Sequence, residues 1–212
     1  MTDDEIEGTL AFLAMAEKLK DTLRTGHTTA GRSESTAEHS WRLCLMALVL
    51  GERLGVDTGR LLGICLVHDL AEALTGDIPA TAARADNGKA AAERAALATL
   101  TAPLPDATRG AISALWEDYE TGATREGRIA KGLDKLETIL QHAQGLNPPG
   151  FDLAYNLDYG RAATDADPLL AALRARLDAR TRARLAEDAK PSGRGSSPSP
   201  LPPGEGGRAA AG

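Results

Sequence analysis

The feature that most limits how this chain can fold is the recurrence of apolar residues at steps of three and four positions. The clearest series is Ile129, Leu133, Leu136 and Leu140. Such spacing brings the apolar side chains to one face of an α-helix, where a neighbouring element can cover them. Alanine and leucine are abundant, runs of β-branched residues are nearly absent, and no segment alternates as a half-buried strand does. The sequence therefore predicts an all-α fold.

Three helices are predicted in the first third of the chain. The first ends before residues 24–26 and carries an apolar stripe of Ile6, Leu10, Leu13 and Leu19. A loop rich in Gly, Thr and Ser follows it. Ser35 followed by Glu38 is a capping-box pattern, which predicts that the second helix begins there. The third helix, over about residues 61–74, is apolar on most faces, so we expect it to lie centrally.

The rest of the chain divides into further helices and a tail. Helices are predicted over residues 89–100, 108–120, 129–140 and 167–186, separated by proline and glycine. From residue 190 onward the chain is rich in Pro, Gly, Ser and Arg, and it cannot bury enough apolar surface to offset its ordering entropy. We therefore predict one domain over residues 1–187 and a disordered tail over residues 188–212.

Composition excludes several classes of function. The formal net charge is −6 and the sequence pI is about 5.3, whereas proteins that bind a nucleic-acid polymer usually present a basic surface. The acidic start of the chain lacks the pattern of a secretory signal, and no apolar run reaches the roughly 20 residues of a membrane helix. We expect a cytoplasmic protein that binds neither nucleic acid polymers nor membranes and acts on a small molecule.

Four residues carry the chemistry that the sequence suggests. His68 and Asp69 close an apolar helix, where an adjacent imidazole and carboxylate are costly unless something binds them. Alone, such a pair is more often structural. His39 near a helix start and Asp134 at the edge of a later apolar stripe change this interpretation. Two imidazoles and two carboxylates from three helices can bind a divalent metal ion and leave positions open for water and substrate.

Two other kinds of metal site fit the sequence less well. A zinc protease requires a second histidine four positions after His68, and Glu72 stands there instead. No cysteine belongs to the set, which disfavours a closed structural zinc site. The pattern favours a catalytic metal site.

The order of these residues is similar to a known family signature. His39, then His68 and Asp69, then Asp134 resembles the H...HD...D pattern of the HD superfamily. Three flanking segments resemble its branch of 5'-deoxynucleotidases; they are ESTAEHSWRLCLMALVL, LVHDLAEALTGDIPA and KGLDKLETILQ. The resemblance covers residues 10–185. It implies an HD-domain helical bundle in which the four residues bind a divalent ion such as manganese, cobalt or zinc.

The resemblance also implies roles for three further residues, and the sequence departs from the family pattern at a fourth. Glu72 matches the catalytic glutamate, and Asp77 matches an aspartate that helps orient water and contacts the substrate sugar. Arg24 matches an arginine that binds the phosphate, for which its planar fork is suited. His27 stands where the family usually has a tryptophan that packs on the sugar, so the preference for deoxyribose is open. It is either a donor near the phosphate or metal, or a solvated loop histidine. The structural alternatives are a surface carboxylate for Glu72, a turn former for Asp77 and a helix-dipole partner for Arg24.

The leading hypothesis is a phosphomonoesterase that hydrolyses nucleoside or deoxynucleoside 5'-monophosphates with a metal-activated water. A second hypothesis keeps the site and changes the substrate to a nucleoside triphosphate, a cyclic nucleotide or another phosphate ester. A third is a catalytically silent HD module that senses a ligand, which the presence of the whole set of site residues disfavours. The resemblance further implies a homodimer, to which the aromatic segment 151–159 is expected to contribute.

Overall fold

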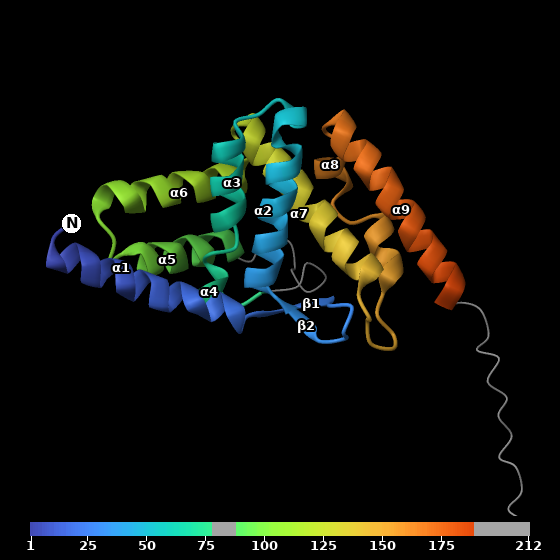
Figure 1. Cartoon of the computed structure of the whole chain (residues 1–212), viewed down its shortest axis with the longest axis horizontal. Coiled ribbons are helices and arrows are strands. Elements are labelled where there is room, and N and C mark those ends of the chain that lie inside the picture. The colour runs from blue at the N-terminus through green and yellow to red at the C-terminus, as the bar shows by residue number, and fades with distance from the viewer. Residues whose placement is uncertain (78–87, 189–212) are drawn as a thin grey trace, which may run out of the picture.

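The computed structural model describes residues 1–77 and 88–188, and this part of the chain is mostly helical (Figure 1). The prediction of an all-α fold is confirmed, with one small two-stranded sheet in addition. The predicted tail over residues 188–212 lies, apart from its first residue, outside the described residues. Among the described helices, none has the length and apolar character needed to cross a membrane.

The elements follow one another along the chain in this order. The N-terminal elements are α1 (Asp3–Ala16), the 3-10 helix η1 (Glu17–Lys20), β1 (Leu23–His27) and β2 (Ser33–Ser35). The central helices are α2 (Thr36–Leu54), α3 (Thr58–Val67), α4 (Glu72–Thr75), α5 (Lys89–Thr101) and α6 (Asp106–Thr121). The C-terminal elements are α7 (Arg125–Gln144), the 3-10 helix η2 (Leu153–Leu157), α8 (Arg161–Thr164) and α9 (Pro168–Asp188). The capping box at Ser35 and Glu38 is confirmed, and it begins α2.

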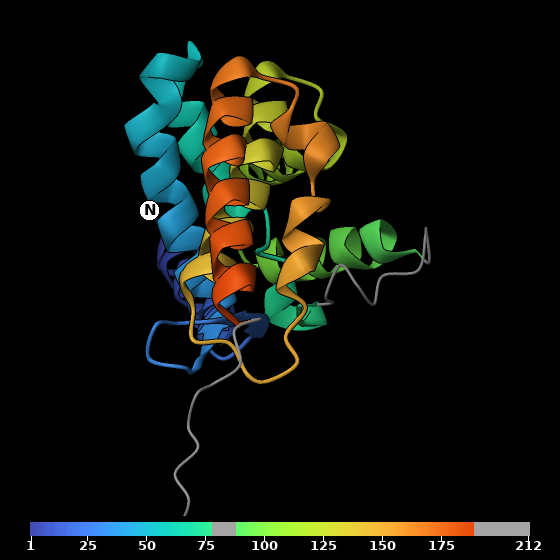
Figure 2. The same ribbon diagram turned by 90° about the vertical axis from the view of Figure 1, so that its right-hand side faces the viewer.

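α7 lies at the centre of the larger of two apolar clusters. It packs against α2, α3 and α9, and α9 runs along it (Figure 2). The predicted stripe of α7 is buried, since Leu133 and Leu136 have no exposed surface, and Ile64 of α3 is equally covered. Replacing such a buried leucine by alanine costs about 2–5 kcal/mol. This packing fixes α2, α3 and α7 relative to one another, and all of the predicted metal ligands lie on or directly after these helices.

The smaller apolar cluster joins Trp116 of α6, which is almost completely buried, with buried residues of η1, α4 and α5. α1 covers only the edge of this cluster. Of its predicted apolar stripe, Ile6, Leu10 and Leu13 face solvent, with Leu10 and Leu13 each 55% exposed, whereas Leu19 falls in η1 and is buried. The neighbouring face of the helix packs instead, through Phe12 and Met15. Apolar spacing identified the helix and did not identify the face that is covered.

A short hairpin forms where the sequence predicts a loop. β1 and β2 pair in antiparallel fashion with His27 opposite Ser33, and the register is irregular. The side-chain amide of Gln141 on α7 donates a hydrogen bond to the carbonyl oxygen of His27. The backbone N–H of Leu146 donates to the carbonyl oxygen of Thr28 at 3.0 Å. These strands lack apolar alternation, and they depend on contacts with a distant helix that no local pattern reveals.

The predicted helix over residues 61–74 is interrupted where the candidate site begins. α3 ends one residue before His68, and tight turns follow in which, for example, Glu72 N donates to Asp69 O at 3.0 Å. The ring nitrogen Nδ1 of His68 pairs with the carbonyl oxygen of Cys65 at 2.9 Å. A further turn of α-helix would use that carbonyl, so the side chain competes with the helical bond. The predicted single helix is therefore two helices, α3 and α4, joined by residues 68–71, which begin with the His68-Asp69 pair.

Candidate metal centre

Three buried side chains from three parts of the chain converge on one point. His39 lies near the start of α2, His68 directly follows α3, and Asp134 lies in the middle of α7. The Nε2 atom of His39 is 3.3 Å from Nε2 of His68 and 3.2 Å from Oδ1 of Asp134. One possible ligand atom from each residue lies within 4.8 Å of the other two. The structure thus brings three of the four predicted ligands together.

Asp69, the fourth predicted ligand, lies at the edge of this cluster. Its Oδ2 atom is 3.0 Å from Nε2 of His68 and 3.8 Å from Nε2 of His39. The same oxygen accepts a hydrogen bond from Nη1 of Arg24 at 3.3 Å. Burial works against ionisation of Asp69, but the charges of His68 and Arg24 outweigh it and hold the pKa of this carboxyl below its ordinary value.

The geometry of the cluster suits a divalent metal ion. Donor atoms that bind one ion at about 2.1 Å lie roughly 3.0 to 3.4 Å from one another in octahedral and tetrahedral sites. The separations of His39 from His68 and from Asp134 fall in this range. Two imidazole nitrogens with carboxylate oxygens form a donor set that zinc, manganese and cobalt accept.

Hydrogen bonds to the other ring nitrogens turn both Nε2 atoms toward the centre. Nδ1 of His68 faces a backbone carbonyl oxygen, and Nδ1 of His39 faces the carboxylate of Glu137. Burial and the charge of Arg24 lower the pKa of His39, but Glu137 and Asp134 outweigh them and raise it to about 10. Without a metal ion, His39 therefore holds a proton that an ion must displace.

Asp134 is held so that one of its oxygens faces the cluster. Its other oxygen, Oδ2, accepts hydrogen bonds from the Tyr119 hydroxyl at 2.6 Å and from Nζ of Lys135 at 2.8 Å. Burial works against ionisation, but the charge of Lys135 and the hydrogen bond with His39 outweigh it and hold the pKa of Asp134 well below its ordinary value. Asp134 is therefore a carboxylate with Oδ1 available for a cation.

Glu72 begins α4 beside the cluster. Its side chain is nearly buried, and Oε2 accepts a hydrogen bond from the hydroxyl of Thr36 at 3.1 Å. Burial and the negative charges of Asp69 and Asp77 raise the pKa of Glu72 to about 9. A nearby cation lowers such a pKa, and a carboxyl group that titrates near neutral pH can both accept and return a proton. The surroundings of Glu72 thus suit an acid-base role.

Arg24 extends from β1 to the predicted ligands. In addition to its bond with Asp69, its Nη2 donates to the hydroxyl of Thr138 on α7 at 3.2 Å. Glu34 lies 3.8 Å from Nε of the same guanidinium. The neighbouring carboxylates, of which Asp69 has the largest effect, outweigh burial and raise the pKa of Arg24 further. A permanent positive charge therefore lies directly beside the candidate metal ligands.

Among the described residues, Asp77 and His27 do not belong to the groups of possible metal ligands. Asp77 follows α4, is partly buried, and has a raised pKa because burial and the charge of Asp69 outweigh the attraction of Arg24. His27 ends β1, and its Nδ1 pairs with the carbonyl oxygen of Thr25 at 3.0 Å. In the described structure the His27 ring therefore contacts its own strand rather than a predicted ligand.

Sequence reasoning missed the side chains that hold the ligands in place. They are Glu137, Tyr119 and Lys135. A signal was available for Glu137, because it follows Asp134 by three positions and the two must share a helix face. Tyr119 belongs to α6, and no local pattern connects it with a ligand on α7.

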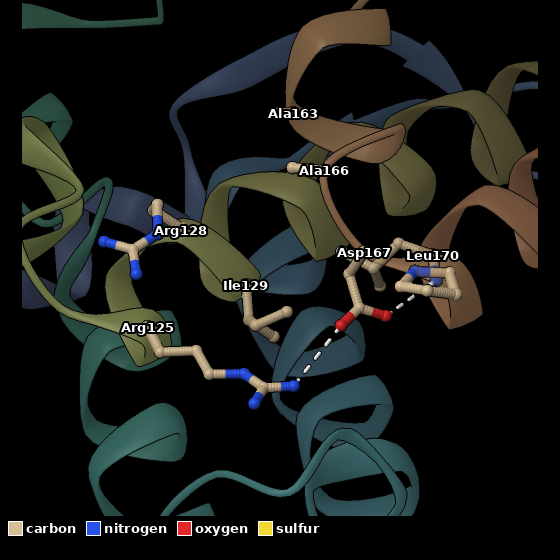
Figure 3. Close-up of a pocket in the computed structure, with 8 residues that line it drawn as sticks. Arg125, Arg128, Ile129, Ala163, Ala166, Asp167 and Leu170 are labelled. Atoms are coloured by element: carbon tan, nitrogen blue, oxygen red, sulfur yellow. Dashed lines mark hydrogen bonds and ion pairs between the residues drawn. The ribbon is translucent and has the colours of Figure 1, made fainter.

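A separate pocket contains none of the predicted site residues (Figure 3). The start of α7 and the segment 163–170 line it. Its charged groups already have partners, since Arg125 lies 3.5 Å from Asp167 and Arg128 donates to the carbonyl oxygen of Gly122 at 2.9 Å. The buried histidine and aspartate cluster, rather than this pocket, is the candidate site.

Comparison with known proteins places these residues in a family context. Residues 16–174 match the sequence model of the HD domain. The 5'-deoxynucleotidase HDDC2 of Homo sapiens is 38% identical over 142 residues, which cover 64% of this chain and 67% of that protein. The 5'-deoxynucleotidase YGK1 of Saccharomyces cerevisiae is 31% identical over 138 residues, which cover 62% of this chain and 64% of that protein.

Solved structures share the same helical architecture. A predicted metal-dependent phosphohydrolase from Magnetospirillum magnetotacticum has a TM-score of 0.74 and 29% sequence identity, with 88% of this chain and 95% of that chain covered. The cyanophage S-2L HD phosphohydrolase DatZ, bound to dA and one catalytic Zn²⁺ ion, has a TM-score of 0.52 and 20% identity, with 82% and 96% covered. At that identity the likeness to DatZ shows the fold alone.

Proposed function

The chain belongs to the HD domain family, and we propose that it is a divalent-metal-dependent phosphohydrolase that converts nucleoside and deoxynucleoside 5'-monophosphates to nucleoside and phosphate. The observation that carries this proposal is the convergence of two imidazole nitrogens and a carboxylate oxygen, from His39, His68 and Asp134, at one buried point. Curated relatives named 5'-deoxynucleotidases, at 31–38% identity, support the choice of substrate class.

We propose His39, His68, Asp69 and Asp134 as the metal ligands. Their nitrogen and oxygen donors fit manganese, cobalt or zinc, and the choice among these ions is part of the proposal. A divalent ion held there supplies a Lewis acid that polarises a phosphoryl oxygen and lowers the pKa of water toward neutrality. The close contacts among these side chains support the assignment.

Glu72 is proposed to orient the attacking water and accept its proton. Its carboxyl group is nearly buried beside Asp69, and burial together with nearby negative charge raises its pKa. A raised pKa makes a carboxylate a stronger base, and it allows the same group to return a proton to the leaving oxygen of the nucleoside. The hydroxyl of Thr36 restrains the carboxyl group and so restricts the direction in which it faces.

Arg24 is proposed to bind the phosphate of the substrate, and Asp77 its sugar. The guanidinium of Arg24 presents several N–H donors next to Asp69, where a phosphate that contacts the metal ligands would lie. Asp77 lies close enough for its charge to act on Arg24. His27, where the family usually has a tryptophan, is proposed as a polar neighbour of the substrate at the far end of β1.

We further propose that the activity resides in one domain over residues 1–187 of a cytoplasmic homodimer that binds neither nucleic acid polymers nor membranes. Apolar surface is available for a dimer, because Trp41, Leu48 and Val49 of α2 are 63%, 59% and 71% exposed. The rings of Phe151 and His142 pack at right angles within the chain, so the aromatic segment is already partly covered. Light scattering on the purified full chain tests the dimer.

The test is phosphate release from a panel of ribonucleoside and deoxyribonucleoside 5'-monophosphates. Metal-free protein is reloaded separately with manganese, cobalt, zinc and magnesium, and His68→Ala is carried through the same preparation to detect contaminating phosphatase. We expect release with at least one metal and none with the variant. Release from deoxynucleotides alone would show that His27 can replace the family's aromatic residue. No release with any metal would overturn the proposal in favour of another phosphate ester or a silent sensor module.

A further inference from the structure

One candidate metal ligand is held by a carboxylate that does not belong to the ligand set. Nδ1 of His39 forms a hydrogen bond with Oε2 of Glu137, and neither side chain has any exposed surface. Glu137 lies one turn after Asp134 on α7, so both carboxylates face α2. His39 therefore lies between two carboxylates of α7, with Asp134 at its Nε2 and Glu137 at its Nδ1.

Glu137 is itself fixed by an arginine. Arg42, three positions after His39 on α2, donates from Nε to Oε1 of Glu137 at 2.6 Å. One oxygen of the carboxylate thus binds Arg42, and the other binds His39. Both His39 and Arg42 belong to α2. The helix that carries the candidate ligand therefore also holds Glu137 in position.

We propose that Glu137 is a positioning residue, which keeps the hydrogen of the His39 ring on Nδ1 and the lone pair of Nε2 directed at the metal position. This inference rests on the proposed function, since it presumes that His39 binds a metal ion. A metal-binding imidazole usually donates its second N–H to such a partner, which fixes the tautomer and strengthens the ligand.

The two histidines are then not equivalent. Nδ1 of His68 donates to a neutral acceptor, the carbonyl oxygen of Cys65. His39 has a charged acceptor, and charge-assisted hydrogen bonds are the stronger kind. The side chain of Glu137 should therefore increase the donor strength of His39 above that of His68.

A purely structural pairing of Glu137 with Arg42 explains less of the geometry. Glu34 also lies 3.9 Å from the guanidinium of Arg42 and is nearly buried, so a second carboxylate is available to balance that charge. If Glu137 served only to pair with Arg42, both of its carboxylate oxygens could accept hydrogen bonds from the planar guanidinium. Instead Oε2 of Glu137 faces the imidazole.

The first experiment compares zinc affinity in two matched variants by competition with a chelator. Glu137→Gln keeps the size of the side chain and removes its charge. Asp178→Asn makes the same change at a buried carboxylate of α9, which is held by Arg161 and Arg174 instead of a histidine. We expect zinc affinity to fall about 10- to 100-fold in Glu137→Gln and to remain unchanged in Asp178→Asn.

The outcomes separate this inference from the proposed function. Wild-type protein with no zinc affinity would overturn the metal site, and the inference with it. Zinc bound equally well by wild type and Glu137→Gln would overturn the inference alone, as would an equal loss in both variants. Two zinc ions in wild type and one in Glu137→Gln would make Glu137 a ligand, since Glu34, His39 and Glu137 also lie close enough to share an ion.

The second experiment needs no variant and holds even if Glu137→Gln fails to fold. Zinc is diamagnetic, so the Nδ1 protons of both histidines can be observed by NMR in the loaded wild-type protein. A proton shared with a carboxylate should resonate farther downfield than one donated to a carbonyl. We therefore expect the His39 signal downfield of the His68 signal. The reverse order, or no Nδ1 proton on His39, would contradict the positioning role.

Discussion

Two buried groups of charged side chains in this molecule differ in how completely they satisfy one another. On α9, Arg174 is almost fully buried, and its three nitrogens all donate, among others to Asp178 at 2.7 Å and to the carbonyl oxygens of Tyr159 and Asn156 at 2.6 and 2.7 Å. Arg161 binds the remaining oxygen of Asp178 at 2.8 Å. Every side-chain nitrogen of Arg174 therefore faces an acceptor, and both oxygens of Asp178 accept.

The group around His39 is arranged differently. Its Nε2 atom lies 3.3 Å from another imidazole nitrogen and 3.2 Å from a carboxylate oxygen, while Glu137 binds its Nδ1 and Tyr119 binds the other oxygen of Asp134. Without an ion, His39 holds a proton that Nε2 can donate to Asp134, so a proton rather than a fixed donor satisfies the inner side of this group. The comparison teaches that fixed donors of the protein satisfy the α9 group, whereas in the His39 group a bound cation can take the place of a proton.

The largest effect that would test this contrast is loss of a candidate ligand. His68→Ala and Asp134→Ala should reduce hydrolysis to background and weaken metal retention, because each removes a donor from the ion. The metal-free His68→Ala protein should unfold at nearly the same denaturant concentration as wild type. Phosphate release, bound-metal analysis and denaturant unfolding are the measurements. Unchanged activity in either variant would remove that residue from the ligand set.

A smaller loss is expected from the acid-base residue. Glu72→Gln should retain the metal ion, because its oxygens are not among the ligands, and should lower kcat by about 10²- to 10⁴-fold. Steady-state kinetics of the metal-loaded variant, with metal content measured on the same sample, distinguish lost chemistry from lost metal. A rate close to that of wild type would exclude Glu72 from the mechanism.

The α9 group should respond in stability rather than in activity. Arg174→Leu leaves Asp178 buried with fewer partners and should lower the free energy of unfolding by about 3–5 kcal/mol. Zinc affinity of the folded variant should not change, because none of its contacts reaches the candidate ligands. Denaturant unfolding and chelator competition measure the two properties. A large drop in zinc affinity with unchanged stability would contradict the view that the α9 group stabilises the fold and takes no part in metal binding.

The smallest effect concerns a third, exposed pair. A hydrogen bond from Arg32 lowers the pKa of Glu38 from 4.5 to about 2, and Ser35 contributes in the same direction. Because the folded-state pKa is depressed, the stabilisation is present above pH 4.5 and is lost as the pH falls from 4.5 toward 2. Both side chains are well exposed, so the gain is small. Wild type and Glu38→Gln should differ slightly in urea midpoint at neutral pH and converge near pH 2.

Local patterns predicted most of the helices and few of the long-range contacts. The stripe from Ile129 to Leu140 predicted α7, and the capping box at Ser35 predicted the start of α2, because both depend on residues a few positions apart. The hairpin is anchored by Gln141, more than a hundred positions from the strand, so the sequence gives no local sign of it. The face of α1 that is covered likewise depends on packing against distant elements, so the apolar spacing of the helix did not predict which face is exposed.

In the candidate site, too, local patterns predicted some residues, whereas long-range contacts placed the others. Histidines and aspartates with recognisable spacing were predicted to meet, and His39, His68 and Asp134 do meet, while their function as ligands remains a prediction. The side chains that orient them escaped prediction, because Tyr119 reaches Asp134 from another helix. Tertiary packing, which places these partners, is not encoded in any single window of sequence.

The distribution of the site along the chain gives a bound ion a role beyond chemistry. His39 is 29 positions from His68, and 98 positions from the Glu137 that holds its ring. An ion shared by α2, α3 and α7 would act as a cross-link that closes long loops, as a disulfide does, and at 100 times its dissociation constant it would add about 2.7 kcal/mol to the folded state. Metal supply would then set the lifetime of the molecule as well as its turnover.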